Sequence, residues 1–554
     1  MTDTSVHLAG ARPAAAKQAE MGLRAPIALA VATAGLALGV SADTLFRDGV
    51  GGVAFAVWIG VLALTLVAIA WEDGRRLPRE SAIWLLSAVA FASCLAWRNS
   101  GVLQFFDVVA TLGCLGLAVI RMRDARAGIL AERMRETVVA GIRVGLETAF
   151  GIFPLTVREM ATPRRRSGIS TRLRIAIRLI ALAVAIVLVF GSLLRSADPI
   201  FASIASFPAI DVGNVVSHVL VILFVGAVVA GWARSALLPT PDRLAIPAGY
   251  GFSLGSPEVL TILGTLNALF ALFVIAQLGW FFGGEQFLRE RTGLTVAQYA
   301  RGGFFQMLWV VALVVPVLVV TRGALQPGRA LARRHTLLAV PIVALLGTMI
   351  ACSMARLNLY VKFYGLTTDR LYPLVFMAWL FATLLWLSAT VLRDWGRPFA
   401  VGAVVAAMVT LMGLNALDPD AFVAGVNVAR AQRPLRPDAE RLDVRYLAQL
   451  SGGAVPYAVD ALIAEDRAAD RTSGDAAGHR CIAANLLLSR FGPAREHRGG
   501  GSVDVDARWR FWNADDAVAA QAVSQHFREL LAVRHGACAL ARVASSPGAA
   551  SPKT

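Results

Sequence analysis

Eleven apolar stretches fill the first three quarters of the chain, and each is about as long as a helix that crosses a membrane. A bilayer core of about 30 Å requires roughly 20 apolar residues per spanning helix. The stretches therefore predict an all-α, polytopic bundle of about eleven transmembrane helices. They lie at 25–46, 51–71, 81–97, 101–120, 176–196, 214–233, 257–281, 303–321, 337–355, 371–392 and 398–415.

The composition argues against a soluble protein. Of 554 residues, 57% are hydrophobic and 16% charged, and the mean hydropathy is +0.62; these values lie outside the usual range for a soluble domain. The net charge of +16 raises the question of nucleic-acid binding. No nucleic-acid fold signature accompanies that charge, so we predict the lipid bilayer as a partner and no nucleic-acid partner.

The distribution of basic residues predicts an orientation. Residues 121–178 hold 13 Arg and five acidic residues, as expected of a cytoplasmic loop at an anionic membrane surface. With the N-terminus inside, cytoplasmic segments carry 27 Lys and Arg, and the opposite short loops carry 9. We expect a multi-pass protein of the cytoplasmic (inner) membrane with a cytoplasmic N-terminus. An odd number of spans then places the C-terminal region outside the cytoplasm.

The same features divide the chain into segments. In the basic loop, Leu130, Met134, Val138 and Ile142 are spaced by four residues, which predicts an amphipathic helix on the membrane surface. After residue 415 the apolar runs become too short to span a membrane. The expected segments are a cytoplasmic tail (1–24), four membrane helices (25–120), the basic loop (121–175), membrane helices five to eleven (176–415), a helical extracytoplasmic domain (416–543) and a disordered tail (544–554).

Two cysteines lie in the C-terminal region. Outside the cytoplasm, Cys481 and Cys538 could form a disulfide that closes a loop of 57 residues. A metal site that adds His479 and His535 is the alternative, but the separations fit no common structural zinc pattern. We therefore expect no metal and no cofactor.

The most specified connection is the polar segment 356–372, RLNLYVKFYGLTTDRLY, which lies between two apolar stretches. A connection between membrane helices needs only polarity and reach, so this density of aromatic, hydroxyl and charged groups predicts either a binding site or a docking element. A second polar segment, 284–304, falls on the same predicted side, and the two could form one polar rim. The rim residues are Arg356, Tyr360, Lys362, Tyr364, Asp369, Arg370, Tyr372, Tyr299 and Arg301.

Polar side chains inside membrane spans are costly and raise a functional hypothesis by default. Asp107 is the clearest carboxylate within an apolar stretch, and it could contact a proton or a cation or serve structure alone. Asn267 and Gln277 lie on one stretch, where interhelix hydrogen bonding is the simpler role. The G-x-S-x-G pattern at 251–255 lacks the preceding strand that a serine nucleophile requires, so we predict no catalytic residue.

The segment YGLTTDRLY at 364–372, followed by an apolar helix, resembles the hallmark of bacterial integral membrane proteins catalogued only as domains of unknown function, the four-one-seven-three and four-one-five-three group. The resemblance implies a many-helix bundle with a C-terminal extramembrane part, and it implies no activity. Gln298 and Gly453 depart from it, because the family usually has an acidic residue at both positions. Further matches are Asn267 with Gln277, Phe282 to Gly284, Gly293 with Tyr299 to Arg301, Asp418 to Asp420 with Asn427, Tyr446 with Ser451 and Pro456, and Trp509 to Asn513.

Three functional hypotheses follow from these residues. The first is a non-enzymatic membrane protein that carries a small or lipid-linked ligand or supports assembly of the cell envelope. The second is a membrane-embedded enzyme for a lipid-linked substrate, with Asp369 as base and Arg356, Lys362 or Arg370 holding an anion. The third is a sensor or scaffold whose C-terminal helices bind protein partners, of which the sequence names none.

Overall fold

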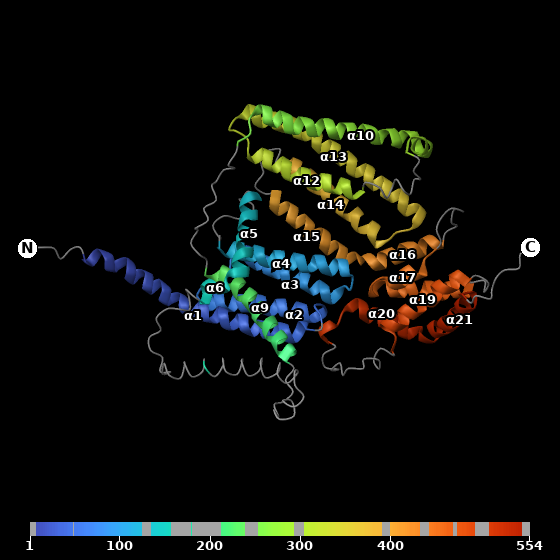
Figure 1. Cartoon of the computed structure of the whole chain (residues 1–554), viewed down its shortest axis with the longest axis horizontal. Helices are drawn as coiled ribbons and strands as arrows, with labels where there is room; N and C mark the ends of the chain where they lie inside the picture. The colour runs from blue at the N-terminus through green and yellow to red at the C-terminus, as the bar shows by residue number, and fades with distance from the viewer. Residues whose placement is uncertain are drawn as a thin grey trace, which may run out of the picture. The chain divides into compact units, whose positions relative to one another are not determined.

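The computed structural model describes residues 7–47, 49–123, 134–156, 179, 212–238, 253–292, 304–390, 399–432, 442–468, 474–493 and 509–545. Within these ranges the regular elements are all helical, and the backbone pairing of Leu254 with Leu325 is an isolated bridge. The predicted all-α fold is confirmed. The helices are α1 (His7–Phe46), α2 (Gly52–Glu72), α3 (Arg79–Trp97), α4 (Gly101–Arg123), α5 (Met134–Phe150), α6 (Ile152–Pro154), α9 (Val212–Leu237), α10 (Ser256–Thr292), α12 (Phe304–Gly323), α13 (Arg329–Tyr364), α14 (Thr368–Thr390), α15 (Phe399–Leu417), α16 (Pro419–Ala431), α17 (Val444–Gln449), η4 (Gly452–Ala454), α18 (Val455–Ala468), α19 (Gly474–Phe491), α20 (Ala514–Gln525) and α21 (Phe527–Ser545) (Figure 1).

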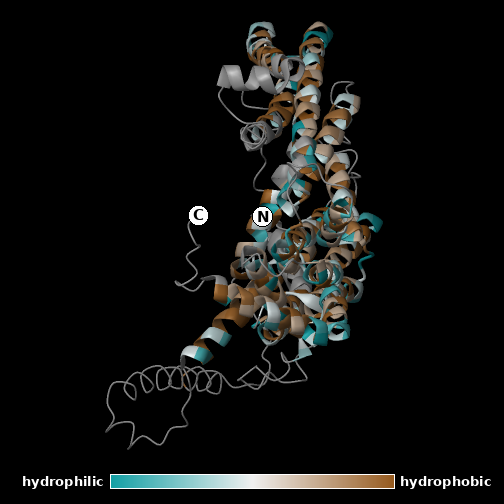
Figure 2. Ribbon diagram, turned by 90° about the vertical axis from the view of Figure 1, so that its right-hand side faces the viewer, coloured by the Kyte–Doolittle hydropathy of each residue, from teal (hydrophilic) through white to brown (hydrophobic). Residues whose placement is uncertain are grey.

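Eight helices of the described ranges are long and apolar enough to cross a membrane, and the chain is a multi-pass membrane protein. Brown, hydrophobic residues recur along the helices in Figure 2. A ninth span is obtained if α15 and α16, which meet at a bend of 54°, count as one. The expected number of about eleven is not confirmed. The stretch 176–196 lies almost wholly outside the described residues, and the stretch at 303–321 overlaps Ala312–Gly323, which is an apolar helix shorter than a span.

One compact unit comprises Met1–Ala90, Thr111–Ala125 and Val139–Pro241. Its main contact joins α1 to α9, which lie side by side (Figure 1). A Cβ atom built on Gly39 would lie 2.4 Å from the carbonyl oxygen of Ile222, and one on Gly35 would lie 2.7 Å from that of Gly226. Small residues at four-residue spacing let membrane helices approach this closely, so backbone packing holds this pair.

The second unit comprises Phe91–Ala110, Arg126–Val138 and Asp242–Thr554. Its membrane part is built from α10 and α12 to α15, which pack around buried aliphatic residues such as Leu263, Leu346 and Leu384. The Asn267 amide links α10 to α13, because Nδ2 donates to the Leu338 carbonyl at 2.8 Å. Such bonds are common between membrane helices, and Asn267 acts structurally here.

The C-terminal helices α16 to α21 of the second unit form a separate hydrophobic core, centred on Val459, Leu462, Leu487 and Leu530. A disulfide between Cys481 and Cys538 joins α19 to α21. At the start of this region, Asp418 caps α16: its Oδ1 accepts from the Ala421 N–H at 3.1 Å, and Pro419 stands at the first helical position. The cap lies at the bend between α15 and α16.

Candidate functional site

The polar segment singled out in the sequence forms the end of α13, a short turn and the start of α14. Gly365 has a φ of +76°, a conformation that favours glycine. A Cβ atom at that position would lie 2.8 Å from Asn427 Oδ1. Leu366, within the turn, and Leu371, in the first turn of α14, are buried in the core of the C-terminal helices. The turn is therefore packed as part of the C-terminal core.

Side chains from two C-terminal helices bond to the backbone of this turn. Asn427 of α16 accepts from the Leu366 N–H at 2.9 Å, and its Nδ2 donates to the Leu366 carbonyl at 2.6 Å. The hydroxyl of Tyr446, on α17, accepts from the Thr368 N–H at 3.0 Å. Buried backbone polar groups must find partners, and here the C-terminal helices supply them. These contacts bond the turn to the C-terminal helices of the same chain.

Arg370 is also engaged within the segment. It donates through NH1 to the carbonyls of Tyr364 at 3.0 Å and of Gly365. Its guanidinium lies 4.3 Å from the ring centre of Tyr360, within cation–π range. Because basic side chains near a helix C-terminus satisfy the last carbonyls, Arg370 caps α13.

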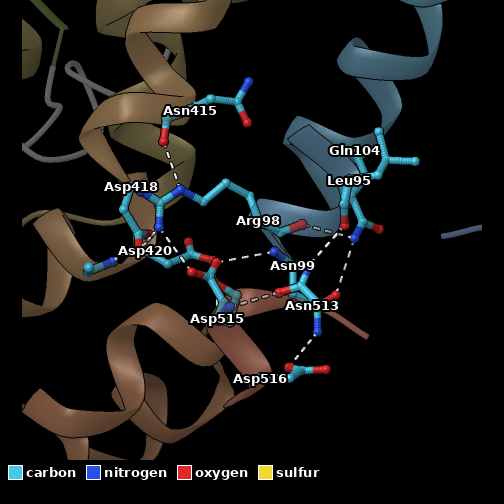
Figure 3. A network of polar contacts seen from close by, with 12 residues as sticks. Leu95, Arg98, Asn99, Gln104, Asn415, Asp418, Asp420, Asn513, Asp515 and Asp516 are labelled. Carbon is cyan, nitrogen blue, oxygen red and sulfur yellow. Dashed lines mark hydrogen bonds and ion pairs between the residues drawn. The ribbon is translucent and has the colours of Figure 1, made fainter. Parts of the chain in front are cut away.

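A buried ionic network lies at the end of α3, within the second unit (Figure 3). Arg98 donates through NH1 to Asp418 at 2.8 Å and to Asp515 at 2.9 Å, and through Nε to the Asn415 carbonyl at 2.7 Å. The three charged side chains are at most 12% exposed. One guanidinium thus joins α3, the α15–α16 bend and the start of α20.

The neighbouring residues extend this network. The Asn99 N–H donates to Asp515 at 3.1 Å, and its Nδ2 donates to Asp516 at 2.7 Å. Asn513 caps α20 through the Asp515 N–H at 2.9 Å, while its Nδ2 donates to the Leu95 carbonyl in the last turn of α3 at 2.8 Å. The start of α20 is therefore bonded to the end of a membrane helix from several directions.

Two further contacts connect the network to α4 and α14. The hydroxyls of Tyr372 and Ser100 lie 3.0 Å apart. Deeper in the bundle, Asn415 Nδ2 donates to Asp107 Oδ1 at 2.9 Å, and both residues are fully buried. Asp107 is thus hydrogen-bonded to the helix that leads into the Asp418 bend.

Burial is the largest influence on the pKa of the carboxyl group of Asp515. Burial raises the pKa of Asp515 above its ordinary value, and the charge of Asp418 adds to the rise, while the Asn99 N–H and Arg98 oppose it. A buried ion pair gains attraction but loses hydration.

The structure distributes the predicted rim residues unevenly. Lys362, Tyr364 and Asp369 are exposed, whereas Arg356 is half-buried. Tyr299 and Arg301 lie outside the described residues, and α10 continues to Thr292 into the second polar segment. Gln277 lies on α10, but its side chain is not among those described. Within the segment 356–372, the residues that contact the C-terminal helices include Leu366, Thr368 and Leu371, with Val361 packed against the same core.

The cysteines and histidines of the C-terminal region do not meet at a metal site. The disulfide uses both Cys481 and Cys538. Across the residues with described positions, no group of three or more His, Cys, Asp or Glu side chains could hold a metal ion. At Gly453, a Cβ atom would lie 2.0 Å from Asp418 Oδ2. The absence of a side chain there leaves room for the Asp418 carboxylate.

A smaller polar cluster joins α1 to α9 in the first unit. Asp43 Oδ2 lies 2.5 Å from His218 Nδ1, and Arg47 donates to Asp43 at 3.0 Å. Arg47 also donates to Asn214 at 2.7 Å and to Ser217 at 3.1 Å. These polar contacts hold α1 and α9 together at one end of the helix pair that the glycines pack.

Sequence reasoning missed Arg98, Asn99 and Asp515. Their partners are more than 300 residues away along the chain, so no local pattern joins them. One signal was present: Arg98 is the single charged residue in the three-residue connection between two membrane stretches. A connection this short brings its charge against the helix ends, where burial is expected.

The comparisons with known proteins identify a family without an assigned activity. A family described as a domain of unknown function, DUF4153, matches residues 82–461. The match begins in α3 and ends in α18, and so includes Arg98, the 364–372 segment and Asp418, while Asp515 and both disulfide cysteines fall beyond it. No curated protein and no solved structure matches the chain.

Proposed function

We propose that this chain, which belongs to the DUF4153 family of domains of unknown function, is an assembly component of the bacterial cell envelope that presents its C-terminal helices at the membrane surface. One observation carries the proposal: the segment that most resembles the family hallmark is used to hold those helices. Asn427 and Tyr446 bond to its backbone, and Leu366 and Leu371 enter their core. A docking role explains these contacts without a substrate.

The ionic network supports the same role. Arg98 joins α3 to two carboxylates of the C-terminal region, and Asn513 bonds to the same helix end. A flexible tether would suffice if the C-terminal helices were only a passive extension. Buried bonds at two separate places instead fix their position relative to α3 and α13, which suits a module that a partner must find in one orientation.

The proposed location is the cytoplasmic membrane, with the C-terminal helices on the outer side. The Lys and Arg distribution supports a cytoplasmic N-terminus. The disulfide between Cys481 and Cys538 supports an oxidising compartment for the C-terminal helices. Alkylation of intact cells followed by non-reducing electrophoresis tests this side: a bridge that forms only after lysis contradicts it.

The enzyme and carrier hypotheses make different demands on the same residues. An enzyme would use Asp369 as base and Arg356, Lys362 or Arg370 to hold an anion; of these three basic residues, Arg370 caps α13. A carrier coupled to protons or cations would use the buried carboxylate of Asp107, which bonds to Asn415. Asp107 is therefore the residue that best separates a carrier from an assembly component.

A paired replacement in the native host tests the proposal. We expect Asp107→Asn, which can keep a hydrogen bond to Asn415, to preserve envelope integrity, measured as resistance to detergents and cell-wall antibiotics. Arg98→Ala should lose that resistance while the protein stays in the membrane. Membrane levels of both variants, determined by immunoblot, provide the control. Loss of function in Asp107→Asn, with Arg98→Ala still active, would favour the carrier and end the assembly proposal.

A further inference from the structure

Three large aromatic side chains lie exposed directly before α20. Trp509 is 47% exposed, Phe511 40% and Trp512 51%. They stand within four residues of one another, next to Asn513, which is itself 4% exposed. Scattered apolar residues on a surface are normal, but a contiguous aromatic group marks an interaction surface.

The position of this segment is fixed by the buried bonds beside it. Asn513 donates to the Leu95 carbonyl at 2.8 Å, and Asp515, two residues later, bonds to Arg98 and to the Asn99 N–H (Figure 3). Trp512 is the direct neighbour of Asn513. The aromatic segment therefore lies at the level where α3 ends.

That level is the boundary of the bilayer. The helix α3 has 19 residues, and at 1.5 Å per residue it is about 28 Å long, close to the roughly 30 Å thickness of the hydrocarbon core. Its last residue, Trp97, is 42% exposed. Tryptophan is enriched at this level of membrane proteins because its ring is apolar and its N–H is polar.

The lipid-facing surface continues from this boundary into the bundle. In the first turns of α4, Val102 is 43% exposed, Phe105 64% and Phe106 49%. Such side chains on a membrane span face acyl chains. The aromatic segment before α20 thus stands near the point where the lipid-facing surface of α4 ends.

We infer that Trp509, Phe511 and Trp512, with Trp97, form an aromatic anchor that inserts into the interface between the lipid headgroups and the acyl chains. The occupant of this surface is the bilayer that holds α3 and α4. Insertion removes three aromatic faces from water, and it adds a lipid contact to the protein contacts that hold the C-terminal helices. The inference does not depend on the proposed function.

Spin-label depth measurements on the full chain in lipid nanodiscs test the anchor. Cys94, Cys114 and Cys352 are replaced by alanine, the native disulfide is kept, and a nitroxide is attached at Trp512→Cys. Val543→Cys on α21, which is 68% exposed, is the matched control. At position 512 we expect at least twofold higher accessibility to oxygen than to a water-soluble nickel complex, and the reverse at position 543.

Two outcomes would overturn the inference. A nitroxide at 512 that is as accessible to nickel as the one at 543 places the segment in water. A nitroxide that is immobile and shielded from both reagents places it against a protein partner or a second copy of the chain. Because Trp512→Cys removes part of the anchor, a second label at Phe511→Cys, with both tryptophans intact, must give the same ranking. Equal melting temperatures of both labelled proteins confirm that the helices remain docked.

Discussion

Glycine backbones hold α1 against α9, whereas charged and amide side chains hold α3 against the C-terminal helices. In the first contact, Gly35 and Gly39 bring two backbones together, and any added side chain would strike a carbonyl group. In the second contact, Arg98 satisfies two buried carboxylates at once. The first arrangement is sensitive to added volume and the second to lost charge, because packing and ion pairing fail in different ways.

The difference follows from the surroundings of each contact. Two helices within lipid gain little from the hydrophobic effect, so they associate by close packing. The C-terminal helices have their own hydrophobic core, and they meet α3 where its backbone and Arg98 require partners. Matching polar groups gives that contact one geometry, since an unpaired buried charge is strongly unfavourable.

Among the replacements that test this comparison, removal of the Arg98 guanidinium should cause the largest loss of stability. Arg98→Ala leaves Asp418 and Asp515 buried without a cation, and we expect a loss of about 3–5 kcal/mol in the free energy of unfolding of the C-terminal helices. Denaturant titration in detergent, followed by hydrogen exchange on α20, measures this loss.

The matched control for this replacement is Arg75→Ala in the first unit. The Arg75 side chain is 48% exposed, pairs with Asp73 and donates to the Leu237 carbonyl. Exposed pairs contribute about 1 kcal/mol or less, so the free energy of unfolding of Arg75→Ala should remain near that of the wild type. Equal losses in the two variants would show that Arg98 is not the centre of a buried network.

Loss of the disulfide should have the next largest effect. Replacement of Cys481 and Cys538 by serine opens a link across 57 residues, which costs about 3–4 kcal/mol in the loop-entropy account. We expect faster hydrogen exchange in α19 and α21, with exchange in α1 and α9 unchanged. Faster exchange throughout the protein would show that stability of the C-terminal helices is not local.

Added volume tests the glycine contact. Gly39→Ala places a Cβ atom 2.4 Å from the Ile222 carbonyl oxygen, and overpacking of this kind costs about 1–3 kcal/mol. Gly60→Ala on α2 is the matched control, because a Cβ atom there meets no atom within 4 Å. Thermal unfolding in detergent should rank Gly60→Ala at or above wild type and Gly39→Ala below it. The reverse ranking would show that the close backbone approach at Gly39 does not contribute to the stability of the protein.

The smallest effect should come from the titration of Asp515. Its pKa is raised by burial in the folded protein, so the folded state binds more protons than the unfolded chain between the ordinary and the raised pKa. The free energy of unfolding therefore falls as pH rises through that interval. The melting temperature of wild type, minus that of Asp515→Asn, should decrease from pH 4 upward. An increase would mean that attraction to Arg98 exceeds the effect of burial.

Hydropathy alone predicted the all-α membrane class, because a stretch of about 20 apolar residues has few other stable structures. The number of spans could not be predicted as well. Helix α13 continues for 36 residues through part of the polar segment, and α16 follows α15 after a bend of 54°. Apolar length does not distinguish a helix that leaves the bilayer from one that ends at its surface.

The candidate site shows a second limit of prediction from the sequence. The segment 356–372 stood out by composition, and the sequence allowed either a binding site or a docking element. The contacts of this segment with the C-terminal helices could not be predicted, since Asn427 and Tyr446 lie 61 and 78 residues away from the backbone groups that they bond. Arg98 and Asp515 are still farther apart along the chain, and no sequence motif around either residue indicates that the two form an ion pair.

The Arg98 network has a consequence for synthesis. The ribosome makes Arg98 417 residues before Asp515, so this ion pair can form only after Asp515 has emerged. Until then α3 and α4 must keep a guanidinium at the bilayer boundary with its last partner absent. The contact of α20 with α3 therefore forms after all the membrane helices of the described ranges have been made, and a chain that terminates before residue 515 keeps Arg98 without its Asp515 partner.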